Sequence, residues 1–83
     1  MVLRVTKIAV DNIYVPTARR TTLHPETVRT LAEDILENGH KTPIQVRPDG
    51  KRYVLVEGLH RLEALKWLGE TQIDAYFVQA KKH

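Results

Sequence analysis

The chain has 83 residues, of which 42% are hydrophobic, and its formal net charge at pH 7 is +3. This length allows one small domain over residues 1–83, and the lack of cysteine excludes disulfides, thiolate zinc sites and thiol nucleophiles. No apolar run approaches the ~18 residues of a membrane span and the N-terminus lacks the apolar block of a signal peptide, so we expect a cytoplasmic protein with no membrane partner.

The first predicted element is a strand over residues 5–13, in which apolar and polar residues alternate. Pro16 ends this strand, and a loop is expected as far as His24. Pro25 suits the first position of a helix, and Asn38-Gly39 suits its end. The apolar residues between them recur at the helical spacing i, i+3, i+4, i+7, i+8, as Val28, Leu31, Ala32, Ile35 and Leu36.

A β-hairpin follows, with strands at residues 43–47 and 53–56 and strong turn chemistry at Pro48-Asp49-Gly50-Lys51. A second helix is expected over residues 60–68, and a last strand over residues 73–78. The order βαββαβ predicts an α+β domain. We expect an antiparallel hairpin and two helices that pack their apolar stripes on the sheet.

The passage from the second hairpin strand into the second helix has the layout of an anion site. Gly58 lets the backbone approach a ligand closely, and the free N–H groups at a helix start favour phosphate or carboxylate. On a helical wheel, Arg61 falls within the apolar stripe and is predicted to face inward, whereas Leu59 falls on the polar side and is predicted to be exposed. The apolar stripe consists of Leu62, Ala64, Leu65, Trp67 and Leu68.

An inward guanidinium needs either a bound anion or an internal partner such as Glu57, and the sequence leaves both open. His24 stands where an N-cap is expected, with its ring capping the helix, exposed to solvent or turned toward a ligand. No P-loop motif, Rossmann motif or serine occurs, and the four histidines lack the spacing of a metal site. We therefore expect no protein-bound metal and no serine triad.

The same segments resemble a known family. The N-terminal domain of ParB-type chromosome and plasmid partition proteins is similar to the runs Val28-x-x-Leu31-x-x-Asp34-Ile35-x-x-Asn38-Gly39, Pro43-Ile44-x-Val46-Arg47, Tyr53-x-Leu55-Val56-x-Gly58-x-His60-Arg61-x-x-Ala64 and Leu68-Gly69. The chain also resembles sulfiredoxin, whose Gly-Cys-His-Arg motif aligns with residues 58–61. The resemblance implies a ParB/sulfiredoxin-like fold with a mixed sheet and two main helices.

The resemblance also implies a nucleotide, either ATP, ADP or CTP, with Mg²⁺ as a companion of its phosphates. The expected phosphate ligands in the turn are Gly58, Leu59, His60 and Arg61. Arg19 or Arg20 resembles an arginine that ParB-type proteins carry in the loop after their first strand. His40, Lys41 and Thr42 lie before the hairpin at the same end of the sheet, and one of them is expected to touch the ligand.

Departures from the two families limit what is carried over. Leu59 stands in place of the sulfiredoxin cysteine, which excludes sulfinic-acid reduction. Leu59, His60 and Glu63 differ from the ParB pattern Gly-Glu-Arg-Arg-x-Arg, which leaves cytidine specificity and nucleotide-gated clamp closure open for this chain. The helix-turn-helix and dimerisation segments that follow the ParB domain are not present in these 83 residues.

Three functional hypotheses remain. The first is a ParB-like module that binds a nucleotide or another phosphorylated anion in a DNA-handling, partition or regulatory system. The second is an enzyme of the same fold, such as a Mg²⁺-dependent phosphotransferase, NTPase or nuclease, with Glu57 or Asp34 as the carboxylate. The third is an interaction domain whose site no longer binds. Any DNA association is expected to be non-specific, and the oligomeric state stays open.

Overall fold

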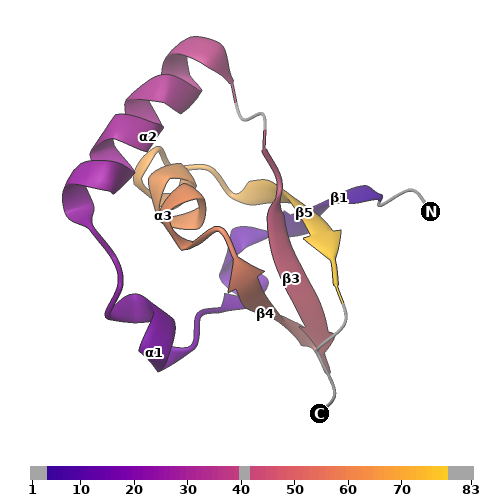
Figure 1. The fold of residues 1–83 in the computed structure, drawn as a ribbon. Helices are drawn as coiled ribbons and strands as arrows, with labels where there is room; N and C mark the ends of the chain where they lie inside the picture. Colours follow the sequence, from indigo (N-terminus) through magenta and orange to yellow (C-terminus); the bar gives the residue numbers. More distant parts are fainter. Residues whose placement is uncertain (1–3, 40–41, 79–83) are drawn as a thin grey trace.

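The computed structural model describes residues 4–39 and 42–78, which form a five-stranded sheet with helices gathered on one side (Figure 1). Within the described ranges, no helix has both the length and the apolar character needed to cross a membrane. The elements in chain order are β1 (Val5–Ala9), a 3-10 helix η1 (Val10–Asn12), β2 (Ile13–Tyr14), α1 (Thr17–Arg20), α2 (Pro25–Asn38), β3 (Ile44–Asp49), β4 (Arg52–Glu57), α3 (Leu59–Trp67) and β5 (Gln72–Phe77).

The sheet is mixed, with the strand order β1-β5-β3-β4-β2. β1 pairs antiparallel with β5, and β3 pairs antiparallel with β4. β3 runs parallel to β5, and β2 runs parallel to β4. The predicted antiparallel hairpin, the α+β class and the mixed sheet are confirmed.

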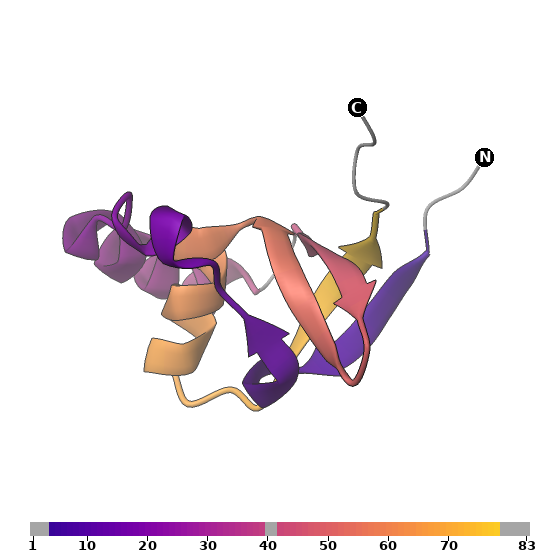
Figure 2. The same cartoon turned by 90° about the horizontal axis from the view of Figure 1, so that it is seen from below.

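The strand predicted over residues 5–13 is wrong in one respect, because the chain turns at η1 within it. Val10 is buried there, and its N–H donates to the carbonyl of Thr71 at 3.0 Å. The two halves, β1 and β2, then lie at opposite edges of the sheet. Because only three residues connect these edges, a span of at most ~14 Å from Ala9 to Ile13, the sheet must curl strongly, as Figure 2 shows.

The helices form two layers over the sheet rather than one. α3 packs against β3, and α2 packs mainly against α3, so α3 lies between α2 and the sheet (Figure 1). The prediction that both helices pack on the sheet is confirmed for α3, while α2 packs mainly against α3 and joins the core through Ala32 and Ile35. The loop predicted before His24 also contains the short helix α1. The most deeply buried large side chains of the core are Ile44, Leu55, Leu62 and Val46.

The orientation of α3 corrects two predictions from the helical wheel. Leu59 is buried in the core cluster at 7% exposure, whereas Trp67 is 66% exposed. The wheel assumed one buried face, but α3 contacts the sheet, α2 and the segment that joins α1 to α2. Leu23 of that segment lies beside Leu59, while the side of α3 that carries Trp67 stays open to solvent.

Candidate functional site

The turn from β4 into α3 depends on Gly58. Its φ of 109° lies in the left-handed region that favours glycine. A Cβ at this position would lie 2.6 Å from Cγ2 of Ile44, a core side chain that is 1% exposed. Both the backbone conformation and the contact with β3 therefore require glycine here.

The start of α3 has donors available for an anion. The N–H of Leu62 donates to the carbonyl of Gly58 at 2.9 Å, and this is the first hydrogen bond of the helix. The N–H groups of residues 59–61 precede it and have no acceptor within the helix. No side chain of the described residues caps this end. Three backbone donors and the positive end of the helix dipole therefore point out of the turn.

His60 is held by the start of α2. The backbone N–H of His24 donates to Nε2 of His60 at 3.1 Å, and the two rings stack with centroids 5.7 Å apart and planes 3° from parallel. Because Nε2 accepts, this arrangement assigns the ring hydrogen of a neutral His60 to Nδ1. The ring of His24 stacks on His60 and does not cap α2. His60 thus keeps one donor, Nδ1–H, for a ligand.

Arg61 is half-buried, and no ion pair involves it within residues 4–39 and 42–78. The internal partner considered from sequence, Glu57, instead lies 3.6 Å from Nη1 of Arg19. The side chain of Glu57 is 70% exposed, so this pair contributes little stability. Among the described residues, no group of three or more histidine, aspartate or glutamate side chains is arranged to hold a metal ion.

The two arginines of α1 lie beside the turn, although some 40 residues of chain separate them from it. Arg19 reaches Glu57, the residue before Gly58. Arg20 lines a cavity of about 220 Å³ together with Leu59. Thr42 is exposed shortly before β3, while His40 and Lys41 fall outside the described residues. The structure thus brings together residues 19–20 and 57–61.

A hollow along α2 was not predicted. It has a volume of about 540 Å³, and α2 begins directly after His24, which contacts His60. The hollow is lined by Glu26, Thr27, Thr30, Leu31 and Asp34. Hydroxyls and carboxylates at positions 26, 27, 30 and 34 form one polar helical face. That spacing was a signal in the sequence, but it equally describes an ordinary solvent-exposed face.

Comparison with known proteins gives a family and a set of folds. Residues 2–83 match the family model of the ParB N-terminal domain. The transcriptional repressor protein KorB of Escherichia coli is 33% identical over 63 residues, which are 72% of this chain and 18% of KorB. The chain thus spans less than a fifth of that relative.

Solved structures share the fold. Sulfiredoxin from Arabidopsis thaliana superposes with a TM-score of 0.81 and 25% identity, over 93% of this chain and 86% of that one. The chromosome-partitioning protein ParB from Caulobacter crescentus, complexed with CTP-gamma-S, superposes with a TM-score of 0.81 and 23% identity, over 94% of this chain and 46% of that one. A free serine kinase mutant in complex with AMP superposes with a TM-score of 0.78 and 19% identity, over 90% of this chain and 31% of that one.

Proposed function

The chain belongs to the ParB N-terminal domain family, and we propose that it binds the phosphate groups of a nucleotide at the turn from β4 into α3. The proposed setting is a partition or other DNA-handling regulatory system, since the family match and the repressor KorB both point there. The observation that carries the proposal is the uncapped start of α3 with Arg61 beside it, free of any described ion-pair partner.

Each group at the turn has a role in this proposal. The backbone N–H groups of residues 59–61 and Nδ1–H of His60 donate to phosphate oxygens, and Arg61 supplies the charge-assisted contact. Among the described residues Arg19 has one ion pair, with the exposed Glu57, and it can exchange that weak ion pair for a phosphate. Arg20 lines a cavity together with Leu59, the first residue of α3, and can approach the same turn.

The nucleoside part is proposed to lie along α2, in the hollow lined by Glu26, Thr27, Thr30, Leu31 and Asp34. Thr27, Thr30 and Asp34 offer hydroxyl and carboxylate partners for ribose hydroxyls and base amino groups. The base stays open between adenine and cytosine, because similar folds are solved with CTP-gamma-S, AMP and ADP. Mg²⁺, where it takes part, would be bound by phosphates and water, as is usual for this ion.

Calorimetric titration of ATP, ADP, CTP and tripolyphosphate, with and without Mg²⁺, tests the proposal. Arg61→Ala should weaken binding by about 1.5–3 kcal/mol, roughly 10- to 150-fold. Arg52→Ala is the control for loss of one positive charge, since Arg52 lies away from the site at the hairpin turn, where it pairs with Asp49 at 3.1 Å. Thr30→Val should weaken the binding of the nucleotides and leave the binding of tripolyphosphate unchanged. If no wild-type titration gives heat, or Arg52→Ala acts like Arg61→Ala, the proposal is wrong.

The alternative is a phosphotransferase, NTPase or nuclease that uses this site. The specific observation in its favour is the carboxylate of Glu57 directly beside the turn, and a serine kinase shares the fold. Product formation from ATP, CTP or DNA with Mg²⁺, abolished by Glu57→Gln while binding persists, would establish it. Binding without turnover supports the nucleotide-binding module. Absence of both supports the third hypothesis, a domain whose site no longer binds.

A further inference from the structure

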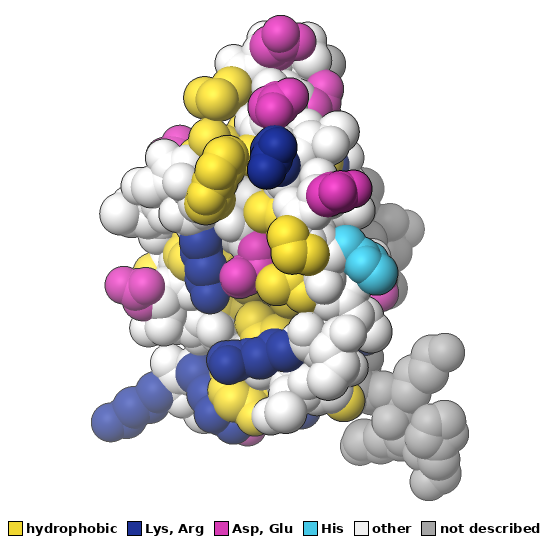
Figure 3. Space-filling model, turned by 90° about the vertical axis from the view of Figure 1, so that its left-hand side faces the viewer, with side chains coloured by type: hydrophobic (Ala, Val, Ile, Leu, Met, Phe, Trp, Pro, Cys, Tyr) yellow, Lys and Arg dark blue, Asp and Glu magenta, His cyan; other side chains and the backbone are white. Residues whose placement is uncertain are grey.

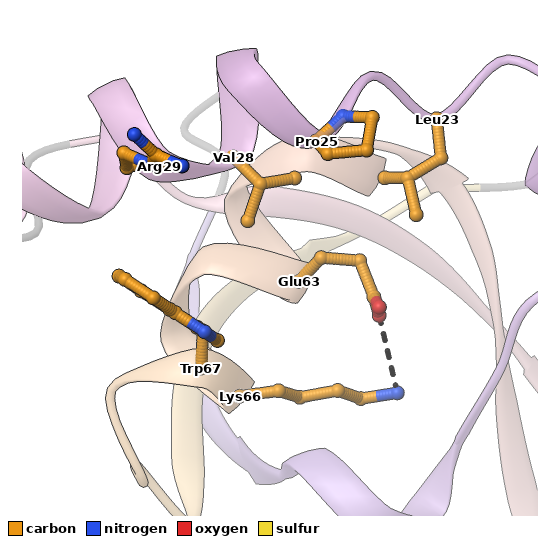
Figure 4. Close-up of a pocket in the computed structure, with 7 residues that line it drawn as sticks. All are labelled: Leu23, Pro25, Val28, Arg29, Glu63, Lys66 and Trp67. Atoms are coloured by element: carbon orange, nitrogen blue, oxygen red, sulfur yellow. Dashed lines mark ion pairs between the residues drawn. The ribbon is translucent and has the colours of Figure 1, made fainter.

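A second concave surface lies between the start of α2 and α3, and we call it the Trp67 groove. Its volume is about 490 Å³, and neither His60 nor Arg61 is among its lining residues. Figure 4 shows side chains from both helices turned toward the space between them. The groove is lined by Leu23, Pro25, Val28, Arg29, Glu63, Lys66 and Trp67.

The floor of the Trp67 groove is apolar, and its largest side chain, Trp67, is exposed to solvent. Trp67 is 66% exposed, although a tryptophan normally buries much of its surface in a core or an interface. Leu23 and Val28, which also line the groove, are only partly buried. Hydrophobic side chains gather over the helices on this face, with both basic and acidic side chains beside them (Figure 3). Exposed apolar surface of this kind marks interaction sites.

The rim of the groove is basic. Arg29 of α2 and Lys66 of α3 are both in the lining, and Glu63, the lining carboxylate, lies 3.3 Å from Nζ of Lys66. The groove shares Leu23, Glu63 and Lys66 with the adjoining cavity, which adds Arg20. The combined surface carries three cations and one carboxylate. An occupant with apolar and acidic groups matches both the floor and the rim.

We propose that the Trp67 groove docks an acidic amphipathic helical segment of a partner protein. Such a segment places apolar side chains at i and i+4 against Trp67 and Val28, and its flanking carboxylates reach Arg20, Arg29 and Lys66. A second copy of this chain fits less well. Two chains of net charge +3 repel each other, and a two-fold interface would bring the two basic rims together.

A peptide-display selection against the 83-residue protein tests this inference with random 14-residue peptides as the probe. The enriched sequences should be acidic, with apolar residues at helical spacing. Trp67 is the single tryptophan of the chain, so binding of a synthetic selected peptide should shift its fluorescence to shorter wavelength. Binding should also weaken as salt is raised.

Variants then locate the contact by anisotropy of the labelled peptide. Trp67→Ala should weaken binding at least about tenfold, in the range of an interface hot spot. Leu36→Ala is the matched control, because Leu36 is an equally exposed apolar residue at 72% on α2 outside the lining, and it should change affinity less than about twofold. Arg29→Glu with Lys66→Glu should favour a peptide whose acidic residues are replaced by lysine.

Three results would overturn the inference. One is a selection that enriches basic peptides or none. Another is a selected peptide that binds Trp67→Ala and wild type equally. The third is a wild-type protein that sediments as a dimer, with Trp67→Ala as a monomer, which would make the groove an interface between copies of this chain.

Discussion

Replacement of Gly58 by alanine tests the geometry on which the whole site depends. An L-residue at φ 109° costs roughly 1–2 kcal/mol in backbone strain. The new Cβ would lie 2.6 Å from Cγ2 and 3.0 Å from Cβ of Ile44, and overpacking of this kind costs about 1–3 kcal/mol. We expect Gly58→Ala to lower the free energy of unfolding by about 2–5 kcal/mol. This is a large part of the ~4–12 kcal/mol typical of 83 residues.

Gly69→Ala provides the control on the other end of α3. Gly69 also has a positive φ, 80°, but a Cβ there meets nothing within 4 Å. Gly69→Ala should therefore lower the free energy of unfolding by the backbone strain alone, about 1–2 kcal/mol. The measurement is urea unfolding followed by circular dichroism, since the exposed Trp67 is a poor reporter of folding.

A double-mutant cycle separates the contact from the backbone. Ile44→Ala removes Cγ2, the atom nearest to the added Cβ. Gly58→Ala should then cost at least about 1 kcal/mol less in the Ile44→Ala background than in the wild type. If the two substitutions add, or if Gly58→Ala and Gly69→Ala lose equal stability, the close approach of β3 to the turn does not explain the glycine.

Three further predictions concern α3 and DNA. Leu59→Ala should lower unfolding stability by about 2–4 kcal/mol and Trp67→Ala by less than about 1, measured by urea unfolding; the reverse order would restore the helical-wheel assignment. His60→Phe keeps the stacked ring and removes the acceptor for the N–H of His24, so it should cost about 0.5–1.5 kcal/mol of stability and weaken nucleotide binding. Unchanged nucleotide affinity would exclude His60 as a phosphate donor. DNA binding should show a log–log salt slope of about −2 to −4 in filter binding with any competitor sequence, and selectivity at physiological salt would contradict it.

Local patterns were sufficient for the elements that carry their own signal. α2 begins at Pro25 and ends at Asn38 as predicted, because the proline, the apolar spacing and Gly39 all act within one segment. The hairpin was predicted in the same way, although Pro48 and Asp49, expected in its turn, belong to β3 and pair with Tyr53 and Arg52. The bounds of α3 and β5 were predicted to within one residue.

Features that depend on distant partners were not predictable in this way. η1 is held to the segment before β5 by the hydrogen bond from the N–H of Val10 to the carbonyl of Thr71, which no local sequence pattern predicts. Leu59 lines a cavity together with Leu23, and His60 accepts a hydrogen bond from the backbone N–H of His24. In each case, the partner lies more than 30 residues away, so a helical wheel of α3 alone assigns the wrong environment.

The meeting of α1 with the turn from β4 into α3 has a topological cause. β2 runs parallel to β4, with Tyr14 opposite Val54, so both strands end at the same end of the sheet. The chain leaving β2 and the chain leaving β4 must therefore lie side by side, and they carry residues 17–20 and 58–61. The contact of Arg19 with Glu57 follows from this pairing. A two-residue strand is too short for a periodic signal, so β2 could not be predicted from the sequence pattern. The two arginines were predicted as ligands from the resemblance to ParB proteins. The pairing of β2 with β4 explains why they reach the turn.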